Sequence, residues 1–157
     1  MHSLLNAASR DAIRERAARL QPDAPARWGR FTAPQMLSHA IQSLRMMTGE
    51  LAVAGAPVPW VVRHAPLRHL LIYVLPFPKG LPTSPELLAR PAADPASMSP
   101  ARWADEQQEL ARALERIEAR ASATDWPAHP AFGAMTGRDW GVLQDRHLAH
   151  HFAQFGV

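Results

Sequence analysis

The chain has 157 residues, of which 47% are hydrophobic and 20% are charged, and these values suit one globular domain over residues 1–157. It contains no cysteine, which excludes disulfides, thiolate metal ligands and a thiol nucleophile supplied by the chain itself. The net charge is only +3 and the arginines alternate with acidic residues, so the composition does not predict nucleic-acid binding.

The sequence also lacks the usual signals for export or membrane insertion. The N-terminus has neither the basic start nor the apolar core of a signal peptide. The longest apolar run, residues 70–77, is too short to span a membrane and is interrupted by Pro76. We therefore expect a cytoplasmic protein that makes no membrane contact, and the lack of cysteine is compatible with that compartment.

Two helices are predicted before residue 49. The first covers residues 5–20, which carry apolar residues at helical spacing and precede Pro22. The second covers residues 32–48. It begins at Thr32, which forms the pattern of a capping box with Gln35.

A long proline-rich connector follows, over residues 49–98. Its middle, residues 61–75, could form one short helix or two that are interrupted at Pro66, and only residues 70–75 hint at strand alternation. Because a structureless connector of this length is unusual, we expect it to pack over one end or side of the remaining structure, as a lid.

Two further helices are predicted in the C-terminal part. One covers residues 99–122, where apolar residues repeat at bundle spacing: Trp103, Leu110, Leu114, Ile117 and Ala121. The last follows Thr136 and runs to about Phe155. Four helices with one long crossover between the second and the third predict an all-α four-helix bundle, with an irregular orthogonal helical fold as the alternative.

The last helix carries the strongest functional pattern. His147 and His151 are spaced i, i+4, and a helical projection places both on the apolar face, with His150 at its margin. An unpaired polar group in a core costs about 1–3 kcal/mol, and one divalent metal ion would satisfy both imidazoles if a third ligand were available. His39 on the second helix is the candidate, although it lies off that helix's apolar stripe and would require a second covered face.

A simpler interpretation remains open, because paired helical histidines are often only packed, hydrogen-bonded side chains. The pair lacks the glutamate of the H-E-x-x-H signature, which disfavours a peptidase. Other side chains are candidates to support the site or to contact a substrate: Gln35, His129, His150 and Gln154. His129 is expected in a loop before the last helix.

The chain resembles a known group in three segments: Q-M-L-S-H-A at 35–40, H-P-A-F-G-A-M-T-G-R-D-W at 129–140 and H-L-A-H-H-F-A-Q-F at 147–155. They are similar to the DinB-like, YfiT-type metalloenzyme superfamily, and most of all to a branch of unknown function. The resemblance implies a four-helix bundle with up-down-down-up topology. It also implies one metal ion, held by His39, His147 and His151.

The resemblance further implies a divalent metal, with zinc or nickel expected, and an external low-molecular-weight thiol, since relatives include bacillithiol- and mycothiol-dependent transferases. By the same resemblance, we expect the protein to bind a small-molecule substrate and to form a homodimer. Two functions stay open at this point. One is a metal-dependent thiol S-transferase or hydrolase. The other is a non-catalytic helical bundle that binds a metal or a small molecule.

Overall fold

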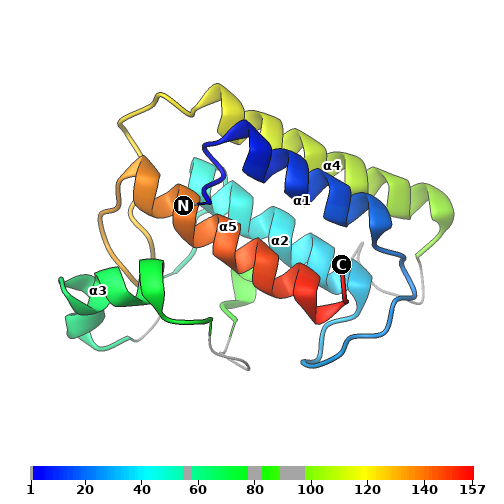
Figure 1. Cartoon of the computed structure of the whole chain (residues 1–157), viewed down its shortest axis with the longest axis horizontal. Helices are drawn as coiled ribbons and strands as arrows, with labels where there is room; N and C mark the ends of the chain where they lie inside the picture. Colours follow the sequence, from blue (N-terminus) through cyan, green and yellow to red (C-terminus); the bar gives the residue numbers. More distant parts are fainter. Residues whose placement is uncertain (1, 55–57, 78–82, 89–97) are drawn as a thin grey trace.

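The computed structural model describes residues 2–54, 58–77, 83–88 and 98–157 (Figure 1). Within these ranges the regular secondary structure is helical, and the single pairing of extended backbone is an isolated bridge between His129 and Gly133. The prediction of an all-α protein is confirmed. No helix in the described ranges is both long and apolar enough to cross a membrane.

Four long helices pack side by side (Figure 1). They are α1 (Ala7–Arg19), α2 (Ala33–Thr48), α4 (Pro100–Ala119) and α5 (Gly137–Gln154). The colours of Figure 1 show that α2 and α4 run in one direction and that α1 and α5 run in the other. The cross-helix contacts agree. Arg10 pairs with Glu118 while Gln107 donates to the Ala17 carbonyl, so α1 and α4 are antiparallel.

The helix starts follow local signals. Thr32 and Gln35 form a complete capping box at α2, and Thr136 with Asp139 forms a second one at α5. The helix ends are less well predicted. The third predicted helix stops at Ala119, so Ala121 is exposed and the prediction that it belongs to the apolar seam is wrong.

The described parts of the connector are short helical turns: η1 (Trp60–Arg63), α3 (Leu67–His69), η2 (Leu70–Val74) and η3 (Pro85–Leu87). Residues 70–75 therefore form no strand. Ile72 is fully buried, and the Tyr73 hydroxyl donates to Asp139 of α5 at 2.5 Å. These contacts hold η2 against α5. The connector prediction over residues 55–57, 78–82 and 89–97 lies outside the described residues.

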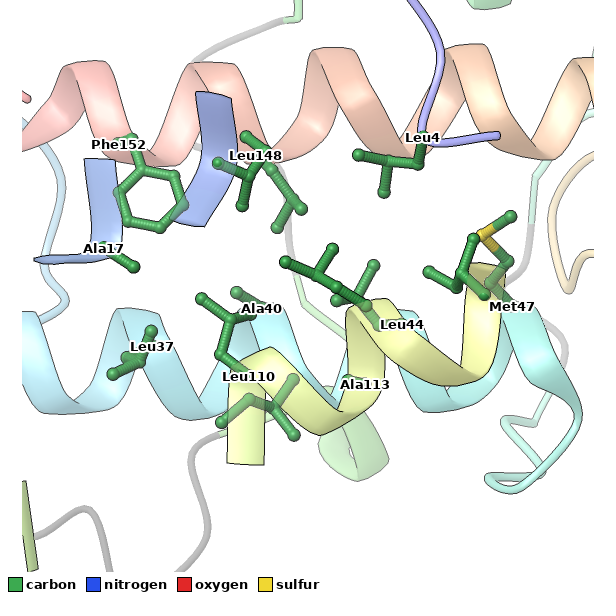
Figure 2. Packing of buried hydrophobic residues seen from close by; sticks show 14 of the residues in the cluster. Leu4, Ala17, Leu37, Ala40, Leu44, Met47, Leu110, Ala113, Leu148 and Phe152 are labelled. Atoms are coloured by element: carbon green, nitrogen blue, oxygen red, sulfur yellow. The ribbon is translucent and has the colours of Figure 1, made fainter. Parts of the chain in front are cut away.

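The bundle interior is filled by aliphatic and aromatic side chains from all four long helices, several of them shown in Figure 2: Ala17, Leu37, Leu44, Leu110, Leu148 and Phe152. Helix α2 is buried on more than its apolar stripe. Its polar residues Ser38, His39, Gln42 and Ser43 are also buried. They are covered because α4, α5 and η3 all contact this helix. This second covered face is what brings His39 into the interior.

Candidate metal centre

The structure brings His39, His147 and His151 together. The Nε2 atom of His147 lies 3.2 Å from Nε2 of His39 and 3.1 Å from Nε2 of His151. One ring nitrogen from each residue lies within 4.8 Å of those of the other two. The cluster joins two helices that are far apart in sequence, because α2 contributes one histidine and α5 contributes two.

Each of these imidazoles has an oxygen acceptor at its other nitrogen. The His39 Nδ1 lies 2.7 Å from the Leu87 carbonyl oxygen. The His147 Nδ1 lies 3.3 Å from Oε1 of Gln144, and the His151 Nδ1 lies 3.2 Å from Oε1 of Gln154. A carbonyl oxygen can only accept, so each of these contacts is a hydrogen bond when the neutral ring carries its hydrogen on Nδ1.

With the hydrogen on Nδ1, each Nε2 has a lone pair and no hydrogen. The contacts of 3.1 and 3.2 Å between these nitrogens are then not hydrogen bonds, because no proton lies between them. A cation among them would replace repulsion with coordination. Tetrahedral zinc with Zn–N distances of about 2.0–2.1 Å separates its ligands by roughly 3.3 Å, close to the two observed spacings. The three side chains therefore fit a metal ion.

The electrostatic surroundings keep the rings neutral. Burial lowers the pKa of His39, partly opposed by its hydrogen bond to Leu87. Burial, together with the adjacent imidazoles, holds the pKa of His147 well below its usual range. The same causes lower the pKa of His151 to about 4. Because a metal ligand must be unprotonated, rings with these depressed pKa values are ready to bind metal at neutral pH.

The other predicted residues lie in different places. Gln154 faces His151, as described above, whereas the side-chain oxygen of Gln35 accepts from the Thr32 amide in the α2 capping box. The ring of His150 lies at the edge of the cluster, with its centroid 5.3 Å from that of His151. His129 lies in the loop before α5 and packs against Trp140.

Two supporting groups were missed by sequence reasoning. Gln144 precedes His147 by three residues, so the same helical spacing that pairs His151 with Gln154 could have identified it. The Leu87 carbonyl had no signal in the sequence. It is a backbone atom, and it reaches His39 only because η3 packs on α2.

His129 is a half-buried histidine with a structural role. Its Nδ1 accepts hydrogen bonds from the backbone amides of Ala131 at 3.0 Å and Phe132 at 3.3 Å, and burial lowers its pKa to about 4. In the unfolded chain the pKa returns to about 6.5. Between these values the unfolded state binds more protons, so the ring destabilises the fold as the pH falls from 6.5 towards 4, and stability recovers as the pH rises.

We expect this ring to remove on the order of 3 kcal/mol of stability at pH 4 relative to pH 7. His129→Asn keeps a side-chain acceptor for the two amides and removes the titration, so its stability should fall less across this range. Urea unfolding of both proteins in EDTA, at several pH values, measures the difference. Equal pH dependence in the two proteins would show that His129 does not contribute.

The fold and the site together define an all-helical protein with a three-histidine candidate metal centre. The chain belongs to the family described as "Protein of unknown function (DUF1569)", which matches residues 2–156. No curated protein and no solved structure matches the chain.

Proposed function

We propose that this protein is a metal-dependent enzyme in which His39, His147 and His151 bind one divalent ion, with zinc or nickel expected. The observation that carries the proposal is the convergence of three Nε2 atoms, each on a ring whose Nδ1 faces an oxygen acceptor. Histidine ligands in metal sites are commonly oriented in this way. Neutral ligands also leave the ion its full positive charge.

We further propose that the bundle is a DinB-like one with up-down-down-up topology. Two observations support this. The helices α2 and α4 run against α1 and α5 (Figure 1). The candidate ligands come from the second and last long helices, as the resemblance to that superfamily implies.

With three protein ligands, a metal ion at this site would keep a coordination position for an external group. Among the described residues, no fourth histidine, aspartate or glutamate joins the cluster. The Nδ1 of His129 is already occupied by backbone amides. A three-ligand site with an open position is typical of catalytic zinc, whereas structural zinc has four protein ligands. This favours catalysis over a purely structural metal.

The bound ion would lower the pKa of a thiol or water molecule and make it nucleophilic near neutral pH. Because the chain has no cysteine, a thiol would come from a separate small molecule. We propose that the thiol loses its proton to solvent and that its sulfur bonds to a small electrophile, displacing a leaving group that takes the bonding electron pair. In the hydrolytic alternative, the oxygen of a deprotonated water molecule displaces the same group. In a dimer, which we also propose by resemblance, each chain would carry its own three ligands.

Aromatic rings surround the cluster. The ring of Phe31 lies 5.2 Å from that of His39 and 6.1 Å from that of His151, and the ring of Phe77 lies 5.7 Å from that of His147. Such rings limit the access of water to the histidines and offer apolar contact to a substrate. They are consistent with a small, partly apolar electrophile.

Metal analysis of protein purified without a histidine tag tests the proposal. We expect one equivalent of metal in the wild type after reconstitution and none in His39→Ala. His64→Ala is the matched control, because this exposed histidine bonds to the Trp60 carbonyl in the connector. A wild type without stoichiometric metal would refute the metal site.

Activity is tested separately on the metal-loaded protein, with several low-molecular-weight thiols and model electrophiles. Turnover that disappears in His39→Ala supports the enzyme. Bound metal without turnover across the panel would favour the alternative, a bundle that binds a metal or small molecule without catalysis.

A further inference from the structure

The central imidazole of the cluster has two competing places for its one hydrogen. On Nε2, the hydrogen of His147 would bond to His39 or His151, which lie 3.2 and 3.1 Å away, and would occupy the nitrogen that a metal needs. On Nδ1, it would bond to Oε1 of Gln144 at 3.3 Å. The metal-free site can therefore satisfy its own hydrogen bonds in a form that does not bind metal, unless another group excludes that form.

The position of Gln144 excludes the form of His147 that carries its hydrogen on Nε2. The Gln144 side chain is 2% exposed, and its Nε2 donates to the Ser43 carbonyl oxygen on α2 at 3.2 Å. If the amide were turned over, its oxygen would face that carbonyl oxygen and its NH₂ group would face His147. The Ser43 carbonyl, which can only accept, thus holds Oε1 towards His147. An unprotonated Nδ1 would then meet an oxygen lone pair, which is unfavourable.

The same arrangement occurs at His151 with groups from another segment. Gln154 presents Oε1 to His151 at 3.2 Å, and its Nε2 donates to the Trp28 carbonyl oxygen at 2.5 Å. The residue after Trp28 is a glycine, which leaves space for the Gln154 side chain. Gly29 has φ +85°, and a Cβ atom there would lie 2.0 Å from Nε2 of Gln154.

We propose that Gln144 and Gln154 are positioning residues that hold the imidazole hydrogens of His147 and His151 on Nδ1 and so keep both Nε2 lone pairs free for a metal ion. The use of those lone pairs rests on the proposed function, but the location of the hydrogens is a property of the metal-free protein. Glutamine is suited to this role because it accepts from the ring and donates to a carbonyl. Glutamate would place an oxygen against that carbonyl.

Long-range ¹H–¹⁵N NMR of the metal-free protein reads these hydrogens directly. In the wild type we expect His147 and His151 in the Nδ1–H form. In Gln144→Met we expect the hydrogen of His147 to move to Nε2. His129 is an internal reference, because its Nδ1 accepts from backbone amides and its hydrogen therefore lies on Nε2 in every variant.

Gln107→Met is the matched control. Gln107 also donates to a backbone carbonyl, that of Ala17 at 2.9 Å, but this residue lies between α4 and α1. The Gln107→Met substitution should therefore leave all histidine signals unchanged. Zinc titration gives the second measurement. We expect affinity to fall about 10–100-fold in Gln144→Met and in Gln154→Met, and to stay at the wild-type value in Gln107→Met.

The inference is overturned if His147 of the wild type carries its hydrogen on Nε2, or if Gln144→Met leaves it on Nδ1. The wild-type spectrum and Gln154→Met answer the question even if Gln144→Met does not fold. A wild type that shows the expected hydrogens but binds no zinc would contradict the proposed function and not the positioning role. The two failures are therefore distinguishable.

Discussion

Zinc is expected to stabilise the folded protein by about 4 kcal/mol when its free concentration is a thousand times its Kd, and His147→Ala is expected to remove this stabilisation. A ligand that binds only the native state shifts the unfolding equilibrium by mass action. His147 is the central ligand of the cluster, since its Nε2 is within 3.2 Å of both others. Without it, two imidazoles remain, and they make a much weaker site.

Urea unfolding with EDTA and with zinc measures the effect, and each variant serves as its own metal-free reference. This design removes any change in packing that alanine causes at position 147. His64→Ala, an exposed histidine of the connector, should keep the full stabilisation by zinc. Equal stabilisation of His147→Ala and the wild type would place the metal elsewhere in the chain.

Leu148→Ala is expected to destabilise the protein by about 3–5 kcal/mol in the absence of metal. Leu148 is fully buried and points from α5 towards α2 in the bundle interior (Figure 2). Its truncation leaves a cavity that the neighbouring side chains fill only in part, which adds to the lost transfer free energy. A loss of this size is a large share of the stability of a typical domain.

Chemical denaturation in EDTA gives this value, and Leu70→Ala is the matched control. The same substitution at Leu70, which is 40% exposed in the connector, should cost less than about 1 kcal/mol. The folded Leu148→Ala protein should still bind one equivalent of metal, because none of the histidine hydrogen bonds involves Leu148. A loss below 1 kcal/mol would show that this part of the interior is loosely packed.

The features that could be predicted from the sequence depend on residues close together in the chain. The capping boxes at Thr32 and Thr136 use side chains three residues apart, so they are visible as patterns and they correctly predict where α2 and α5 begin. The placement of His147 and His151 on one face of α5 follows from helical periodicity in the same way. His39 is the candidate third ligand from the residues alone, and the resemblance to a known superfamily implies the same residue.

The remaining features depend on contacts between distant segments. A helical projection assumes one buried face, and it left His39 off the apolar stripe. The tertiary structure buries this residue because α5 and η3 cover a second face of α2. Gln35 shows the reverse case. Its position one turn before His39 suggested a role in the site, but its side-chain oxygen is used in the helix cap.

The helical class, the starts of two helices and the pair of histidines on α5 can all be predicted from spacing along one helix. The nitrogen of each ring that faces the cluster cannot be predicted in this way. That choice depends on the carbonyl oxygens of Leu87, Ser43 and Trp28, which belong to other segments of the chain. Backbone carbonyls are present at every residue and carry no sequence signal, so their role appears only once the segments are packed together.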